Sequence, residues 1–300
     1  MDRAELGLGE SLRPPALPPT MRARSGGVGR LVRRSPVVAI GAVLIVVVVL
    51  LALAAQFIAP YSPVAQIAQP LLRPGPGFLA GTDELGRDEL SRLIFGAQVS
   101  LYVGILAVSI ALAGGATSGI LAGFYGGWVD NALMRVMDVL FSLPAIVLAI
   151  AITSILRPSL TNAMIAIGIV YAPTFARIAR GPTLAVVNLA YIEAARAVGV
   201  PNWKIMLRHV LPNISAPLIV QTTVSLSTAI LTEAALSFLG LGTQPPTASW
   251  GLMLSAARQY MLIDPWIAIF PGVAIALTVL GFNLLGDGLR DLLDPRIRTV

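Results

Sequence analysis

Long apolar stretches alternate with short polar segments along most of the chain. A helix needs about 20 predominantly apolar residues to cross the hydrocarbon core of a bilayer, which is roughly 30 Å thick. Six stretches meet this requirement or come close to it. The pattern therefore predicts an all-α polytopic membrane protein with six transmembrane helices. The predicted spans are 37–59, 99–124, 134–156, 162–178, 217–239 and 266–285, of which the fourth is the shortest.

The basic side chains are distributed unequally between the two sides of this topology. With the N-terminus in the cytosol, sixteen Lys and Arg residues fall on the cytosolic side and five on the other. Membrane proteins carry an excess of Lys and Arg in their cytosolic loops. We therefore expect both termini to be cytosolic.

The spans divide the chain into five regions. A cleavable signal peptide is the alternative for the first span, since residues 52–54 resemble a cleavage site. That span is longer than the apolar core of a signal peptide, which has roughly 7–15 residues, so we expect a membrane helix. The expected regions are a flexible, Pro-, Gly- and Arg-rich cytosolic tail (1–34), the first transmembrane helix (35–60), an extracytoplasmic segment (61–98), a core domain of five helices (99–289) and a cytosolic C-terminal tail (290–300).

The extracytoplasmic segment contains a short predicted helix. Asp88 has the right side chain to cap its first turn, and apolar residues recur at helical spacing over 90–97. We expect this helix to lie along the membrane surface or to pack on the outer mouth of a pore.

Composition excludes several classes of protein. The chain is 56% hydrophobic and 12% charged, with a net charge of +6. Because the cations flank the spans, the basic charge does not indicate a nucleic-acid partner. There is no cysteine, there is one histidine, and the glycine-rich stretch 114–119 lacks the lysine of a P-loop. We therefore expect no catalytic residue, metal or cofactor in this chain.

Small residues recur every fourth position in the second span. Gly115, Gly119 and Gly123 follow Ala111 at this spacing. Such a stripe allows two membrane helices to approach closely. We expect it to serve helix packing, and contact of the glycine backbone with a substrate is the alternative.

Two acidic residues and three prolines fall inside the spans. Asp138 is one turn from Arg135, which predicts a local ion pair. Glu233 has only Thr232, Ser237 or another helix to bond, so it is either structural or part of a translocation path. The prolines at positions 144, 173 and 271 are expected to kink their helices.

A polar cassette, residues 191–213, interrupts the apolar pattern and reads YIEAARAVGVPNWKIMLRHVLPN. Its first part favours a helix, which Gly199 breaks. Pro201 suits the first turn of a second short helix, and we expect Pro212 to end it. A cytosolic helix–glycine–helix unit of this kind is suited to bind a soluble motor protein that moves a membrane pore.

This cassette resembles the EAA loop of ABC importer permeases, with His209 departing from a frequent isoleucine. The blocks 81–101, 123–138, 237–254 and 286–296 resemble more narrowly the C-type permease subunit of dipeptide and oligopeptide importers. The resemblance covers roughly residues 35–297 and implies the type I ABC importer (MetI-like) permease fold in a prokaryotic plasma membrane.

The resemblance also implies partners and a coupling site. It implies a heterodimer with a B-type permease, two cytosolic ATP-binding subunits or domains that bind ATP and magnesium, and an extracytoplasmic solute-binding protein that delivers peptide. Trp203, Ile205 and Met206 would supply an apolar docking face for the ATPase. Arg196, Lys204 and Arg208 would pair with acids at its rim, and the alternative for these cations is the positive-inside signal alone. The implied coupling residues are Glu193, Ala194, Ala195, Arg196, Gly199, Pro201, Trp203, Lys204, Ile205, Met206 and His209.

Other functions remain open at this point. The same machinery serves nickel chelates, haem or sugars in related permeases. An ion-coupled secondary transporter is a further alternative, but such carriers usually contain internal repeats, and the sequence contains no convincing repeat.

Overall fold

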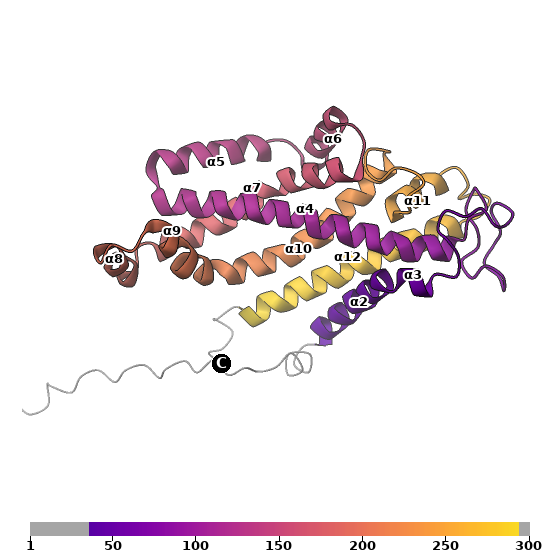
Figure 1. Cartoon of the computed structure of the whole chain (residues 1–300), viewed down its shortest axis with the longest axis horizontal. Coiled ribbons are helices and arrows are strands. Elements are labelled where there is room, and N and C mark those ends of the chain that lie inside the picture. The colour runs from indigo at the N-terminus through magenta and orange to yellow at the C-terminus, as the bar shows by residue number, and fades with distance from the viewer. Residues whose placement is uncertain (1–35, 294–300) are drawn as a thin grey trace, which may run out of the picture.

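The computed structural model of the protein describes residues 36–293 (Figure 1). The expected tail over 1–34, and 294–300 of the expected C-terminal tail, lie outside the described residues. Within the described part the chain is helical and contains no strand. The helices are α2 (Pro36–Leu53), α3 (Ala55–Ile58), α4 (Glu89–Tyr125), α5 (Gly127–Phe141), α6 (Ala145–Leu156), α7 (Leu160–Val186), α8 (Ala190–Ala197), α9 (Asn202–Ile205), the π-helix η1 (Met206–Val210), α10 (Leu211–Phe238), α11 (Trp250–Ala257) and α12 (Trp266–Leu293).

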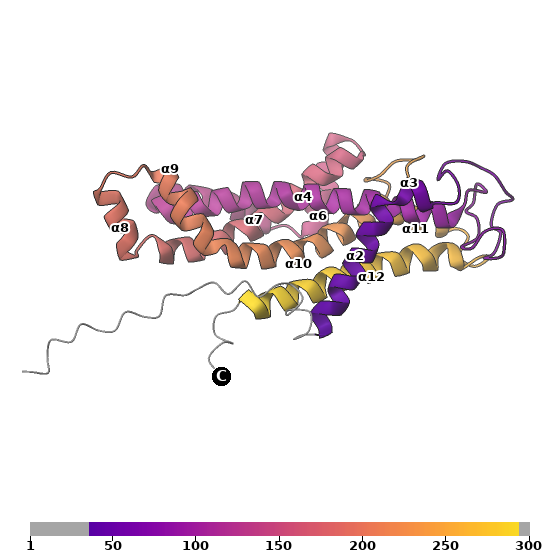
Figure 2. The ribbon, with the colours of Figure 1, turned by 60° about the horizontal axis from the view of Figure 1, so that its bottom comes forward.

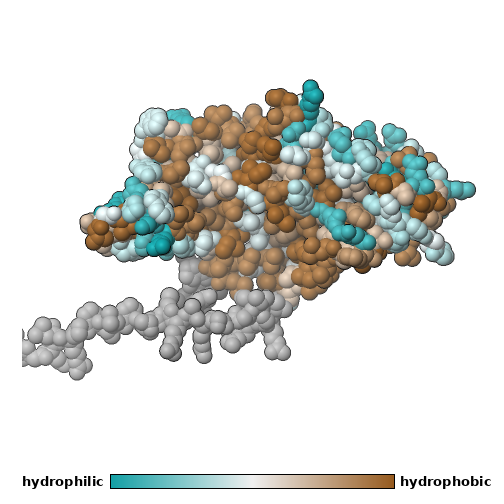
Figure 3. Space-filling model, viewed as in Figure 1, coloured by the Kyte–Doolittle hydropathy of each residue, from teal (hydrophilic) through white to brown (hydrophobic). Residues whose placement is uncertain are grey.

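The helices form an elongated bundle. α4, α7, α10 and α12 run along its long axis, and α2 packs across α12 (Figures 1 and 2). α8 and α9 lie at one end, while α11 and the segment 60–88 lie at the other. On the face in Figure 3, hydrophobic side chains cover much of the middle, and hydrophilic ones gather toward the two ends. This distribution suits a bundle that crosses a bilayer.

The predicted spans correspond to helices of the structure. Five helices are long and apolar enough to cross a membrane, and a bent pair formed by α5 and α6 makes up to six. The two members of this pair meet at 91°. Pro144 directly precedes α6, and the ring and missing N–H of proline interrupt a helix at such a point. The kink predicted at this proline is therefore confirmed.

The predicted extracytoplasmic helix is the first part of α4, so the expectation of a separate helix along the membrane surface is wrong. Asp88 does cap it, because its carboxylate accepts the backbone N–H of Ser91 at 2.8 Å. No helix-breaking residue separates 89–97 from the apolar stretch that follows, and Trp250 of α11 packs on Gly96. One helix therefore runs from residue 89 through the apolar stretch, and the packing of α11 on Gly96 supports its first part.

A buried ionic cluster holds the segment before α4. The carboxylate of Asp83 accepts Nε of Arg87 at 2.6 Å and lies 3.2 Å from Nε of Arg92. The same carboxylate also accepts the backbone N–H of Arg87. All three residues are buried. Because these charges are paired with one another, their mutual attraction offsets the free energy lost when they are removed from water. The cluster thereby fixes the segment 60–88 to the end of the bundle.

The most extensive contact between long helices joins α4 to α7. A Cβ on Gly115 would lie 2.7 Å from Cβ of Phe175 and closer still to the carbonyl oxygen of Ala172. Gly119 and Gly123 meet α7 in the same way one and two turns further on. Glycine at these positions therefore lets the two backbones approach each other.

We predict that Gly115→Ala destabilises the protein, because the added methyl group has no room and overpacking of this kind costs about 1–3 kcal/mol. The matched control is Gly114→Ala, since a Cβ there meets no atom within 4 Å. The measurement is the thermal midpoint of both variants in detergent. Equal midpoints for the two variants would contradict the close packing of α7 on Gly115.

Candidate functional site

The cassette 191–213 forms two short helices at one end of the bundle (Figure 2). α8 ends at Ala197, and Gly199 follows with φ of +79°, a conformation that side chains other than glycine rarely adopt. α9 begins directly after Pro201. The predicted helix–glycine–helix arrangement is therefore present.

The prediction that Pro212 ends the second short helix is wrong. α9 passes through the π-helical turn η1 directly into α10, and Pro212 lies in the first turn of α10. The N–H of Leu211 bonds to the carbonyl of Met206, five residues earlier. Because the backbone already departs from the α-helical bonding pattern here, it accommodates a proline without a break. The second helix of the cassette and α10 are thus one continuous element.

Buried apolar side chains anchor the cassette to the bundle. Ile192 of α8 and Ile205 of α9 are fully buried and belong to the same hydrophobic core as α4, α7 and α10. Ile205 was expected on the docking face, and its burial places it in this anchor instead. Met206 is partly buried against the same core.

The exposed apolar surface of the cassette comes from other residues. The exposed fractions are 57% for Trp203, 57% for Leu207 and 79% for Val198. Glu193 and Ala194 are exposed as well. Sequence reasoning missed Val198 and Leu207, although the i,i+4 spacing of Trp203 and Leu207 places both on one face of a helix.

The polar side chains of the cassette bind its parts together. The ring of His209 lies 6.0 Å from that of Tyr191, and Asn213 donates to the Tyr191 hydroxyl at 3.1 Å. The guanidinium of Arg196 lies 5.0 Å from the ring of Phe124 in α4, and Nζ of Lys204 lies 5.5 Å from the Trp203 ring. These contacts connect α8 to α10 and to α4 and so hold the cassette against the bundle.

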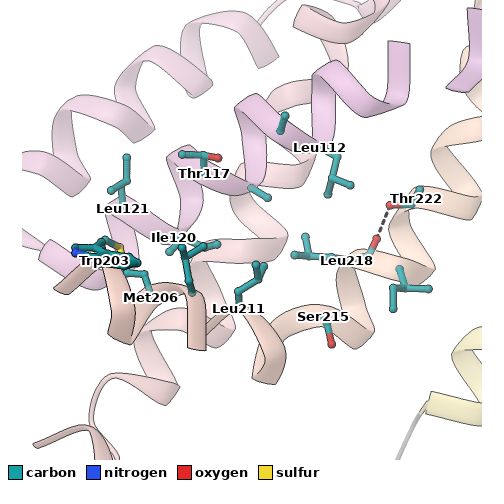
Figure 4. Close-up of a pocket in the computed structure, with 14 residues that line it drawn as sticks. Leu112, Thr117, Ile120, Leu121, Trp203, Met206, Leu211, Ser215, Leu218 and Thr222 are labelled. Atoms are coloured by element: carbon teal, nitrogen blue, oxygen red, sulfur yellow. Dashed lines mark hydrogen bonds between the residues drawn. The ribbon is translucent and has the colours of Figure 1, made fainter. Parts of the chain in front are cut away.

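An apolar groove of about 580 Å³ lies beside the cassette. Side chains of α4 form one wall, and side chains of α9, η1 and α10 form the other (Figure 4). The labelled lining residues are Leu112, Thr117, Ile120, Leu121, Trp203, Met206, Leu211, Ser215, Leu218 and Thr222.

Two ion pairs join α5 to α7 near the cassette. Arg180 binds Asp130 through two hydrogen bonds of 2.5 and 2.6 Å. Asp138 accepts a hydrogen bond from Arg177 at 2.8 Å, so the predicted pairing with Arg135 of its own helix is wrong. The physical reason is the fold, which brings α7 beside the face of α5 that carries both aspartates.

Glu233 lies near the opposite end of α10. Its side chain is fully buried, and its Oε1 accepts hydrogen bonds from Ser237 at 2.6 Å and Thr243 at 3.2 Å. Ser237 was one of the partners considered from the sequence, whereas Thr243 belongs to the loop after α10.

In residues 36–293 no group of three or more His, Cys, Asp or Glu side chains is arranged to hold a metal ion.

Comparison with known families gives two matches. Residues 115–299 match the family model described as binding-protein-dependent transport system inner membrane component. Residues 28–74 match the N-terminal TM domain of oligopeptide transport permease C.

Individual proteins are similar over most of the chain. The glutathione transport system permease protein GsiD of Pectobacterium atrosepticum is 44% identical over 272 residues, which cover 90% of each chain. The dipeptide transport system permease protein DppC of Alkalihalophilus pseudofirmus is 50% identical over 219 residues, 73% of this chain and 72% of that one. The di/tripeptide transport system permease protein DppC of Pseudomonas aeruginosa is 47% identical over 265 residues, 86% of this chain and 88% of that one.

A solved structure has the same fold. It is an inward-facing MetNI methionine ABC transporter, with a TM-score of 0.54 and 20% identity, and the match covers 67% of this chain and 96% of the other.

We predict that the Asp130–Arg180 pair stabilises the α5–α7 contact more than the Asp138–Arg177 pair. The first pair is bidentate and its aspartate side chain is 13% exposed, whereas that of Asp138 is 58% exposed. A double-mutant cycle with alanine should give a coupling energy of about 1 kcal/mol for the first pair and about 0.3 kcal/mol for the second. SDS-driven unfolding measures both, and equal coupling energies would contradict this ranking.

Proposed function

Since this chain belongs to the family of binding-protein-dependent transport system inner membrane components, we propose that it is the C-type permease subunit of an ATP-driven importer of short peptides. The names of similar proteins from Alkalihalophilus pseudofirmus and Pseudomonas aeruginosa support dipeptides and tripeptides as the substrate class. The observation that carries the mechanism is the continuity of the second helix of the cassette with α10, because it joins an exposed surface at one end of the bundle to a helix that runs along the long axis of the bundle (Figure 1).

In this proposal the cassette is the contact with a cytosolic ATPase subunit. Trp203 and Leu207 offer an exposed apolar face, and Ala194 leaves a low surface beside the carboxylate of Glu193. The helical residues from 202 to 210 form a rod of about 13 Å at 1.5 Å per residue, long enough to lie in a groove of a partner protein. ATP and magnesium would bind to that partner and not to this chain.

ATP binding would then move the pore through the cassette. Closure of two ATPase subunits changes the position of each docked cassette, and the attached α10 follows because no flexible segment lies between them. A nucleotide shifts such an equilibrium only by its differential affinity for the two states, and moving a 1:99 equilibrium to 99:1 takes about 5.5 kcal/mol.

The apolar groove beside the cassette favours a second permease subunit of the B type as the partner within the membrane. Its walls, on α4 and α10, are almost entirely apolar. Ala113 of the lining and the adjacent Gly114 are small and exposed. Small residues allow close approach of a helix from another subunit. An extracytoplasmic binding protein would deliver substrate at the opposite end of the pore, and the excess of basic residues favours cytosolic termini.

Glutathione is the second candidate substrate. The observation in its favour is the 44% identity with the glutathione permease of Pectobacterium atrosepticum over 90% of both chains. Glutathione is itself a small peptide, so both candidates require the same kind of pore.

The direct test is uptake of labelled dialanine and of labelled glutathione by cells that lack this subunit. We expect dialanine accumulation to fall to background and to return when the subunit is supplied. Uptake should survive a protonophore while cellular ATP is maintained, which an ion-coupled carrier would not do. Loss of glutathione uptake alone would replace the first candidate with the second, and unchanged uptake of both would contradict the proposal.

We predict that Gly199→Val uncouples ATP hydrolysis from uptake. A β-branched residue at φ +79° costs about 1–2 kcal/mol of backbone strain, which would change the angle between α8 and α9. A Cβ at this position meets no atom of the surrounding structure within 4 Å, so the expected effect comes from the local backbone.

Gly199→Asn is the matched control, since asparagine tolerates the left-handed region. Both variants should insert and assemble normally in membrane fractions. Uptake per ATP hydrolysed in proteoliposomes should fall for valine and stay near wild type for asparagine. Wild-type coupling in the valine variant would show that coupling does not depend on the left-handed turn at Gly199.

A further inference from the structure

Glu233 is the acceptor for two hydroxyl groups that come from different elements. Ser237 belongs to the last turn of α10, and Thr243 belongs to the loop 239–249 that follows. All three side chains are buried, with exposed fractions of at most 1%. One carboxyl oxygen therefore ties the loop to the helix in a place that water does not reach.

Further contacts fold the same loop back onto the end of α10. The backbone N–H of Thr243 donates to Oγ of Ser237 at 2.9 Å. The N–H groups of Leu241 and Gly242 donate to the carbonyl of Leu236 at 2.8 and 3.2 Å. The residues beyond, Gln244–Thr247, are exposed. The loop thus has a base that is fixed to α10 and a tip that faces outward.

The helix after the loop is fixed to α10 as well. A Cβ on Gly251 of α11 would overlap the backbone of Ala234, and Ser255 donates to the carbonyl of Phe238 at 2.8 Å. Trp250 then connects α11 to α4 through a 2.9 Å hydrogen bond to the carbonyl of Leu93. The loop 239–249 is therefore held at both of its ends.

A carboxyl group in this position is costly, because a buried acid loses its hydration and an unpaired one inside a membrane protein is rare. Its second oxygen has no hydrogen-bond partner among the described residues. An apolar side chain would avoid this cost but would leave the Thr243 hydroxyl without its acceptor. The arrangement is explained if the junction between helix and loop has to remain closed while α10 moves.

We propose that Glu233 is a positioning residue that locks the loop 239–249 to α10, so that a displacement of the cassette moves the exposed loop tip together with the helix. α10 has 28 residues, a length of about 42 Å at 1.5 Å per residue, and it continues without a break into the cassette. The inference rests on the proposed function in one respect, which is that an ATPase moves the cassette.

The experiment uses the absence of cysteine from the chain. A single Gln244→Cys substitution places a thiol at the exposed loop tip of the assembled importer in nanodiscs. The rate of its reaction with a water-soluble maleimide is measured without nucleotide and in the ATP-trapped state. We expect the two rates to differ by at least about fivefold, the lower end of typical coupling between sites.

Glu233→Leu in this background should reduce the difference between the two rates while ATP hydrolysis persists, because the loop loses its buried side-chain bond to α10 and keeps only the backbone bonds at its base. Glu233→Gln should preserve it, since its Oε1 still accepts both hydroxyl groups. Thr243→Val removes the hydroxyl group that the loop donates to Glu233 and should reproduce the leucine variant. It covers the case that Glu233→Leu fails to assemble. Thr228→Val is the matched control, because this hydroxyl bonds only to carbonyls of its own helix.

Two outcomes would overturn the inference. One is equal maleimide rates in both nucleotide states of the Gln244→Cys protein, because the loop tip would then not move with the helix. The other is a nucleotide-dependent difference that is as large in both Glu233→Leu and Thr243→Val as in the protein that carries Gln244→Cys alone. Either result leaves the proposed function intact, since that is tested separately by uptake and by the Gly199 variants.

Discussion

The contact between α4 and α7 is the constraint on which the rest of the structure depends. Lipid tails are as apolar as the helix surfaces, so these helices gain little from simple hydrophobic burial and are held by close packing. Gly115, Gly119 and Gly123 remove side-chain volume along three successive turns and let α7 lie directly on α4. α7 leads into the cassette, and α4 carries one wall of the groove beside it.

Polar interactions then fix the two ends of this frame. At one end, the carboxylate of Asp83 with its two arginines holds the segment before α4. At the other, Arg180 with Asp130 holds α5 to α7 next to the cassette. Both sets of charges lie toward the ends of the bundle and away from its apolar middle, where a charge would be most costly. The ends are therefore specific and rigid, which a protein that transmits motion along its length requires.

The path of force in the proposed importer follows from the same geometry. The cassette is anchored by Ile192 and Ile205, and its exposed face includes Trp203 and Leu207. It continues into α10 through the π-helical turn, and Glu233 lies near the far end of that helix. A displacement at one end therefore reaches the other without crossing a flexible segment, which is how a soluble motor can act on the opposite mouth of a pore.

The sequence by itself determined the number and order of the apolar spans, the cap at Asp88, the break at Gly199 and the kink at Pro144. Each depends on residues close together in the chain, whose helical spacing and backbone preferences are local properties. The tertiary structure alone decided that Asp138 pairs with Arg177, that Ile205 faces the core, that the helix continues past Pro212 and that Glu233 binds Thr243. Such outcomes depend on which helices become neighbours, and neighbours in space are chosen by packing over the whole bundle.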